Sequence, residues 1–132
     1  GSETTTMPTT GTASYSGTRL GYGSTGAAPF AFTGAAALGV NFATGAVSNV
    51  TFSGFTTQDV NDGNPGPTLP TLTGSGGAGT IVGNKFTGPI AGGALGGSTA
   101  GAFYGPNANE TAGTFQAAGG AISLIGSFGA HQ

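Results

Sequence analysis

The chain has 132 residues, which is room for one domain. Gly, Thr, Ala and Ser make up about 61% of it, and charged residues make up only 5%, against roughly 25% in an average globular protein. With a formal net charge of −2 and two basic residues, Arg19 and Lys85, the chain lacks the cations that a nucleic-acid partner would require. The absence of Cys excludes disulfides, thiolate catalysis and Cys-based metal sites.

The spacing of the bulky residues indicates strands rather than helices. The 29 Gly are spread along the chain, and each Gly inside a helix costs roughly 1 kcal/mol relative to Ala. Leu38, Val40 and Phe42 alternate with small or polar residues, which is the period of a strand with one buried face. We therefore expect an all-β fold.

Alternation and turn residues predict eight strands. Thr44-Gly45 and residues 119–120 are expected to be tight turns, and Pro70 restricts the fourth strand to an edge or a bulge, because it lacks a backbone donor. In chain order the predicted strands cover about 12–18, 35–43, 46–55, 68–73, 80–88, 98–104, 111–118 and 121–130.

Eight short strands with one bulky face favour a small antiparallel up-and-down β-barrel, since closure removes unpaired edges. Phe and Leu would fill the interior, and Gly beside them would let the wall bend. A two-sheet β-sandwich is the alternative. The residues between the bulky ones are mostly Ser, Thr, Asn and Gly rather than the apolar band and aromatic girdles of a membrane barrel, so we expect a soluble barrel that does not span a membrane.

The first ten residues differ in composition from the rest. Gly1-Ser2 is typical of a tag remnant, and the Thr-rich stretch to Thr10 is typical of a flexible linker. We expect residues 11–132 to form a single barrel domain.

The connections between the predicted strands differ in length. In a simple meander, residues 19–34, 56–67 and 89–97 would form long loops at one end of the barrel. Loops on a rigid frame often carry binding residues. This predicted rim holds five candidate binding residues: Arg19, Tyr22, Phe30, Asp59 and Asp62.

The titratable residues offer little for catalysis or metal binding. His131, the only His, is expected in a solvated tail rather than as a haem or metal ligand. The segment around Asp59 and Asp62 places oxygen donors at alternate positions, but its Gly and Glu positions do not match an EF-hand, so we expect an Asx-rich turn there. Four acidic residues give few ways to build an acid–base pair, so an enzyme is disfavoured and no catalytic residue is assigned.

Residues 101–115 read G-A-F-Y-G-P-N-A-N-E-T-A-G-T-F, and residues 126–130 read G-S-F-G-A. This pattern resembles the closing strands of the barrel domain of bacterial transferrin-binding protein B and related surface lipoproteins, which read G-x-F-Y-G-P-x-A-x-E-x-x-G-x-F and end in G-x-F-G-A. The matched positions to which we assign structural roles are Phe103, Tyr104, Gly105, Pro106, Glu110, Gly113, Phe115 and Phe128.

Two contacts are expected within this motif. Glu110 lies where its carboxylate could accept hydrogen bonds from turn amides. Phe103 and Phe115 are expected to meet across a hairpin.

The resemblance implies an eight-stranded barrel at the bacterial cell surface (outer membrane, outward-facing) or secreted, which binds a partner and catalyses nothing. Members of that family bind host transferrin, complement regulators or haem. The resemblance therefore implies a host protein or a small solute as partner. We expect a monomer without a cofactor, with haem as the alternative. The sequence shows neither the lipidated Cys nor the handle domain of that family. A haem carrier and a structural barrel domain of a larger surface protein stay open as alternatives.

Overall fold

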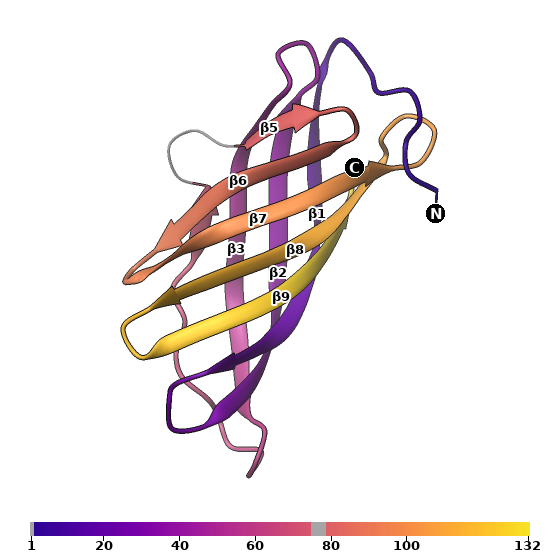
Figure 1. Ribbon diagram of the computed structural model, residues 1–132. Coiled ribbons are helices and arrows are strands. Elements are labelled where there is room, and N and C mark those ends of the chain that lie inside the picture. Colours follow the sequence, from indigo (N-terminus) through magenta and orange to yellow (C-terminus); the bar gives the residue numbers. More distant parts are fainter. Residues whose placement is uncertain (1, 75–78) are drawn as a thin grey trace.

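The computed structural model describes residues 2–74 and 79–132 and shows an all-β chain wound into a barrel (Figure 1). Gly1, part of the expected tag remnant, lies outside the described residues. The strands are β1 (Thr12–Ser24), β2 (Pro29–Asn41), β3 (Ala46–Asp59), β4 (Leu72–Gly74), β5 (Gly79–Val82), β6 (Lys85–Gly92), β7 (Leu95–Tyr104), β8 (Glu110–Gly119) and β9 (Ile122–His131).

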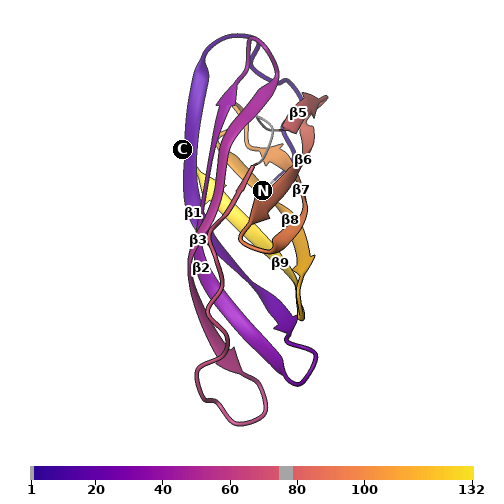
Figure 2. The same ribbon diagram turned by 90° about the vertical axis from the view of Figure 1, so that its left-hand side faces the viewer.

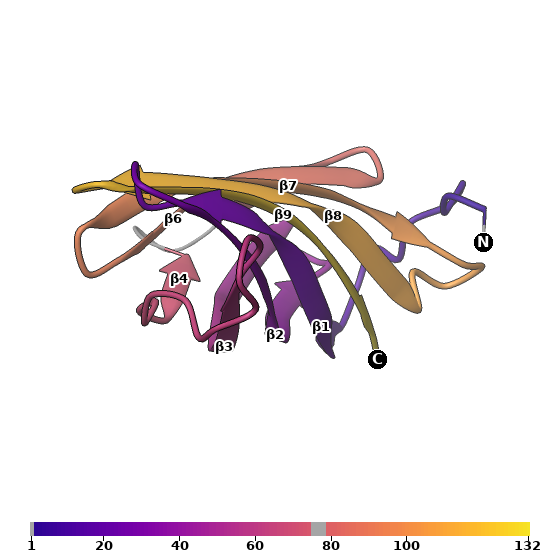
Figure 3. The ribbon, with the colours of Figure 1, turned by 90° about the horizontal axis from the view of Figure 1, so that it is seen from below.

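Strand pairing closes the barrel. β1 pairs with β2 on one side and with β9 on the other, which joins the first strand to the last. β4 and β5 each pair with β3 and with β6, so these two short strands share one position in the wall. The predicted eight-stranded antiparallel barrel is confirmed, with one of its strands in two pieces, and the barrel is flattened into two layers when seen from below (Figure 3). The described residues contain no helix long and apolar enough to cross a bilayer.

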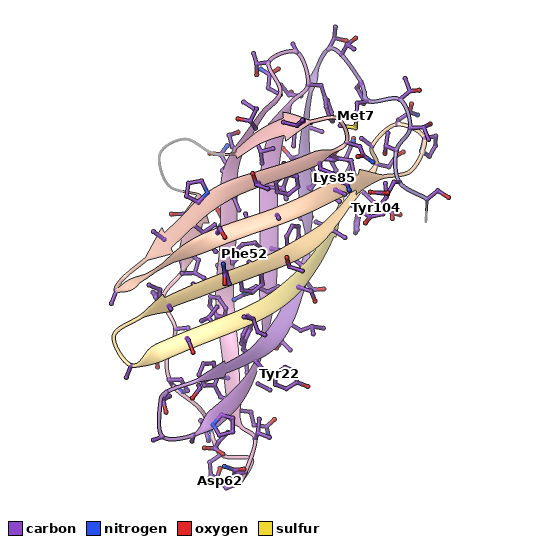
Figure 4. The ribbon with its side chains drawn as sticks, in the orientation of Figure 1. Met7, Tyr22, Phe52, Asp62, Lys85 and Tyr104 are labelled. Carbon is purple, nitrogen blue, oxygen red and sulfur yellow. The ribbon has the colours of Figure 1, made fainter. Side chains whose placement is uncertain are left out.

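The interior of the barrel is a connected network of aromatic rings. Phe52 lies at its centre and stacks on Phe115 with ring centroids 4.5 Å apart, while Phe128 lies 5.4 Å from Phe52 (Figure 4). Ring contacts of at most 6.4 Å join Tyr15 and all nine Phe into this network: Phe30, Phe32, Phe42, Phe52, Phe55, Phe86, Phe103, Phe115 and Phe128. The prediction that bulky aromatics fill the interior is therefore confirmed.

Glycine allows the wall to close around these rings. A Cβ at Gly97 would lie 1.8 Å from the carbonyl oxygen of Gln116, and one at Gly113 would lie 2.0 Å from that of Ala100. A Cβ at Gly17 would meet the carbonyl of Gly129 on β9, and one at Gly119 would meet that of Ala94 in the turn between β6 and β7. No side chain fits between a backbone and a carbonyl at such distances, so these positions require Gly.

Several predicted strand limits are wrong, because the strands are longer than their bulky residues suggest. β1 continues to Ser24 and β2 begins at Pro29, so residues 25–28 replace the long loop predicted at 19–34. β6 continues to Gly92 and β7 begins at Leu95, so the predicted loop at 89–97 is a tight turn.

The fourth and fifth predicted strands also need correction. Only residues 72–74 are paired in the fourth, because Pro70 lies in the connection before it. The segment predicted as one strand over 80–88 is split by a turn at Gly83, whose φ of +65° favours Gly, so it forms β5 and β6.

Both chain ends pack on the connection between β7 and β8, at the upper end of the barrel in Figure 1. Thr4 donates its amide to Phe103 O at 2.9 Å and its hydroxyl to Gly105 O at 2.8 Å. From the other terminus, Gln132 donates its side-chain amide to Ala108 O at 3.1 Å, beside the buried Tyr15 hydroxyl, which donates to the same carbonyl. The segment expected to be a flexible linker thus begins with residues bound to the barrel.

Replacing Gly97 with Ala is expected to lower the free energy of unfolding by about 1–3 kcal/mol, the usual range for overpacking. Gly96→Ala is the matched control, because a Cβ at Gly96 meets no atom within 4 Å. Urea denaturation of both variants measures the difference. Equal stabilities would show that close approach of the strands does not constrain the wall.

A second expectation concerns Tyr15 at high pH. Burial raises the pKa of its hydroxyl, and the hydrogen bond from Gln132 offsets part of that rise. The unfolded chain therefore loses this proton at a lower pH than the folded chain does. The contribution of neutral Tyr15 to the free energy of unfolding is complete below the pKa of the unfolded state, and it is lost as the pH rises through the pKa of the folded state. Urea midpoints measured at pH 8 and above about pH 10 should fall more for the native chain than for Tyr15→Phe; parallel falls would contradict this.

Candidate functional site

Of the three long loops predicted at one end of the barrel, the described part of the chain contains one long connection. Residues 60–71 link β3 to β4 at the lower end of the barrel (Figure 2). Asp59 Oδ1 accepts from the Asn61 amide at 2.7 Å, and Asp62 Oδ1 accepts from the Asn64 amide at 2.9 Å. The Asx-rich turn expected here is confirmed, and both carboxylates serve to shape it.

The placement of two predicted rim residues is wrong. Arg19 and Phe30 lie in strands with their side chains inside the barrel, each only 1% exposed. The error has one cause: both lie in stretches taken for loop, where the strand alternation in fact continues. Tyr22 also lies in a strand, but it faces outward (Figure 4). Asp59 ends β3 and Asp62 lies at the exposed tip of the connection, so the binding role of the outward-facing residues stays a prediction.

The motif residues are parts of the frame. Phe103, Phe115 and Phe128 are buried in the aromatic network, and Gly105 and Pro106 form the turn, with Gly105 at a φ of +90°. The expected contact of Phe103 with Phe115 is wrong, because Phe103 lies opposite Thr111 and Phe115 lies opposite Thr99.

The expected role of Glu110 is also wrong. Asn109 Oδ1, rather than the Glu110 carboxylate, accepts the turn amide, that of Asn107, at 3.3 Å. Glu110 is exposed at the start of β8, beside the half-buried Tyr104 and opposite the exposed His131 on β9. Among the described residues, no group of three or more acidic or His side chains could hold a metal ion.

The outer wall carries an exposed apolar cluster that the sequence reading missed. Leu20, Tyr22 and Ile125 are 57%, 63% and 64% exposed. Tyr22 on β1 lies directly opposite Ile125 on β9, and Leu20 is two residues from Tyr22 on the same face. We call these three residues the outer-wall patch. Exposed side chains of this size in one place are typical of a protein-binding surface.

A ridge and two shallow hollows extend from this patch. Ile125 lies opposite Gln116 on β8, and Gln116 lies opposite Ser98 on β7, so one row of side chains crosses the sheet. A hollow lies on each side of the row, with volumes of about 540 and 660 Å³. Their floors are made by small residues, among them Gly96, Ala100, Ala118, Ser123 and Ser127.

The residues that line both hollows are uncharged. Hydroxyl groups and the Gln116 amide provide hydrogen-bonding groups around the apolar side chains, and the hollows are open rather than enclosed. This arrangement suits contact with a protein surface and offers no titratable pair for acid–base chemistry.

A sequence signal for the patch exists. Leu124 and Phe128 share the inward parity of β9, whereas Ile125 has the opposite parity. Leu20 and Tyr22 are likewise out of phase with the inward-facing Tyr15 and Arg19 on β1. Large apolar residues at the outward positions of a strand indicate a contact surface.

The comparisons with known proteins agree with this architecture. The family model described as "C-lobe and N-lobe beta barrels of Tf-binding protein B" matches residues 7–132. The chain belongs to this family. No curated protein gives a significant match.

Solved structures of transferrin-binding protein B share the fold. A mutant of the Haemophilus parasuis protein is 23% identical over 98% of this chain, with a TM-score of 0.67. Isotype 1 from serogroup B Neisseria meningitidis is 24% identical over 94%, with a TM-score of 0.63. HpuA from Kingella denitrificans, solved in complex with human haemoglobin, is 20% identical over 99%, with a TM-score of 0.61. The chain spans 28%, 26% and 48% of these three proteins, so it corresponds to one part of each.

Replacing Ile125 with Ser should change the free energy of unfolding of this barrel by no more than about 0.5 kcal/mol, as is usual for exposed positions. Leu124→Ser is the matched control: Leu124 is buried in the core, so its loss should lower the free energy of unfolding by about 2–5 kcal/mol. Thermal and urea denaturation measure both. A large loss for Ile125→Ser would assign this residue to the frame instead of a contact surface.

Proposed function

We propose that this chain is a non-catalytic binding domain of the bacterial cell surface, which recognises a host protein. Three features support the proposal: membership of the transferrin-binding protein B barrel family, the shared fold with proteins named for transferrin binding, and the shared fold with HpuA, which was solved with human haemoglobin. The partner class that these relatives suggest is a host iron-carrier protein.

The observation that carries the proposal is the outer-wall patch. Tyr is among the residues most often responsible for binding energy at protein interfaces, and the aliphatic Leu20 and Ile125 beside Tyr22 provide apolar area at low cost in desolvation. The small residues in the hollows let a partner approach the sheet closely. We infer that the contact lies on the wall of the barrel, whereas the sequence suggests loops at one end.

Binding through this surface should depend little on salt, because the residues that line the hollows are uncharged. Human transferrin and human haemoglobin are the probes. Immobilised on a sensor, at least one of them should bind the native chain, with affinities at 50 mM and 500 mM NaCl that agree within roughly threefold. A steep loss of affinity with salt would contradict contact through this uncharged face.

The double variant Tyr22→Ser/Ile125→Ser tests the location of the contact. Removal of two interface anchors should weaken binding roughly 10- to 100-fold. Val82→Ser is the matched control, because Val82 is 77% exposed on β5, away from the patch. No binding of the native chain to either probe would reject iron carriers as partners. Equal binding by the double variant would reject the outer-wall patch.

A further inference from the structure

Among the described residues, Arg19 is the one cation in the barrel interior. Its guanidinium Nη1 donates to the carbonyl oxygen of Ala35 at 2.9 Å. Its Nε and Nη2 are buried and have no hydrogen-bond partner among residues 2–74 and 79–132. Burial lowers the pKa of Arg19 to about 10, so the group still carries its charge at pH 7. A buried charged group without hydrogen-bond partners for two of its nitrogens is costly.

The two unpaired atoms form a matched pair. In a planar guanidinium the Nε–H and Nη2–H bonds point in parallel from one edge, and this is an edge that binds a carboxylate through two hydrogen bonds. We call this edge the Arg19 fork. Its geometry suits a planar oxyanion better than a single acceptor atom.

Three features of the surrounding strands hold the guanidinium in place. Gly34 leaves room for it, since a Cβ there would lie 2.0 Å from Nη1. The β2–β3 register shifts between Thr33 and Ala35, so that residues 54 and 55 of β3 lie opposite the single Gly34. Gly54 in this bulge has a φ of +63°, and the Phe55 ring that follows covers the guanidinium at 3.3 Å from its Cζ. Gly34 and Phe55 thus restrain the guanidinium, while the Arg19 fork has no hydrogen-bond partner in the described part of the chain.

A row of aromatic rings leads from the Arg19 guanidinium towards the lower end of the barrel. The Phe55 ring lies 5.4 Å from that of Phe32, which lies 6.4 Å from that of Phe30. Gly66 of the 60–71 connection lies against Phe30, because a Cβ on Gly66 would be 3.3 Å from the Cβ of Phe30. Displacement of this connection would uncover Phe30.

The wall beside this connection has few strand pairs. β4 forms only two residue pairs with β3 and two with β6. The 60–71 connection is held to β3 by the Thr57 hydroxyl, which donates to Pro67 O at 2.6 Å, and by the Gly66 amide, which donates to Thr57 O at 3.1 Å. Nearer its start, the Asp59 amide donates to Asn64 O at 2.8 Å, and Gln58 Nε2 donates to Gly63 O at 3.1 Å. For residues 60–71 to move aside, these hydrogen bonds must break and Leu69, which is buried in the core, must be withdrawn.

We propose that the Arg19 fork binds the carboxylate of a small amphiphilic solute, whose apolar part lies among Phe30, Phe32 and Phe55 after residues 60–71 have moved aside. The fork selects a carboxylate, and the rings select an apolar tail. This interior site is separate from the outer-wall patch and does not depend on the protein partner proposed above.

Octanoate is the probe, and 1-octanol, which has the same tail without the carboxylate, is the control ligand. Arg19 is the only Arg in the chain, so its 15Nε–H signal in a nuclear magnetic resonance spectrum needs no further assignment. Octanoate should shift this signal in the native chain, and octanol should not. No shift with octanoate, an equal shift with octanol, or shifts confined to the outer-wall patch would overturn the proposal.

Calorimetry with Arg19→Met provides the second measurement. This variant keeps an apolar side chain of similar length and removes the fork, so octanoate should bind it at least 10-fold more weakly than it binds the native chain. Equal affinities would overturn the proposal. If Arg19→Met does not fold, the 15Nε–H signal of the native chain decides the question alone.

The access route has its own test. The chain has no Cys, and a Cβ on Gly66 would lie 3.1 Å from the Cβ of Thr57, close enough for the double variant Thr57→Cys/Gly66→Cys to form a disulfide. The oxidised variant should lose octanoate binding, and reduction should restore it. Equal binding in both states would overturn the route past residues 60–71.

Discussion

The whole structure depends on the close approach of neighbouring strands around a core of aromatic rings. Phe52, Phe115 and Phe128 require space at the centre, yet a barrel this small leaves little room beside the rings. Where a strand bends around the core, the carbonyl oxygens of its neighbour reach the space that a side chain would occupy, as at Gly97 and Gly113. The high Gly content of the sequence therefore accompanies its high Phe content. Phe side chains fill the barrel, and Gly lets the strands approach closely enough to close it.

This pairing explains why the fold could be predicted from the sequence. The alternation of Leu38, Val40 and Phe42 identifies strands and their inward face, and the absence of helical spacing excludes the main alternative. Strand ends were harder to place. The end of β1 is hard to predict because Gly21 and Gly23 occupy the inward positions after Arg19. Gly gives no hydrophobic alternation from which the strand could be recognised.

The uncertainty about strand ends also limits how much of the candidate site can be predicted. The sequence predicts a loop at Tyr22, whereas Tyr22 lies in β1 and is exposed because its side chain points outward from the strand. Ile125 was missed, since its contribution depends on the register that places it beside Tyr22. Arg19 could not be recognised as an interior residue, because a buried cation is unusual and only the bulge at Gly54 shows how its guanidinium is accommodated.

Both termini lie at the upper end of the barrel, where each is hydrogen-bonded to the connection between β7 and β8, while residues 60–71 lie at the opposite end (Figure 1). Attachment of the chain to a solid support through either terminus would consequently give the same orientation. The end of the barrel with Asp62 would face the solution. The outer face of the sheet with Tyr22 would lie roughly perpendicular to the support and would be accessible to a large approaching molecule (Figure 4).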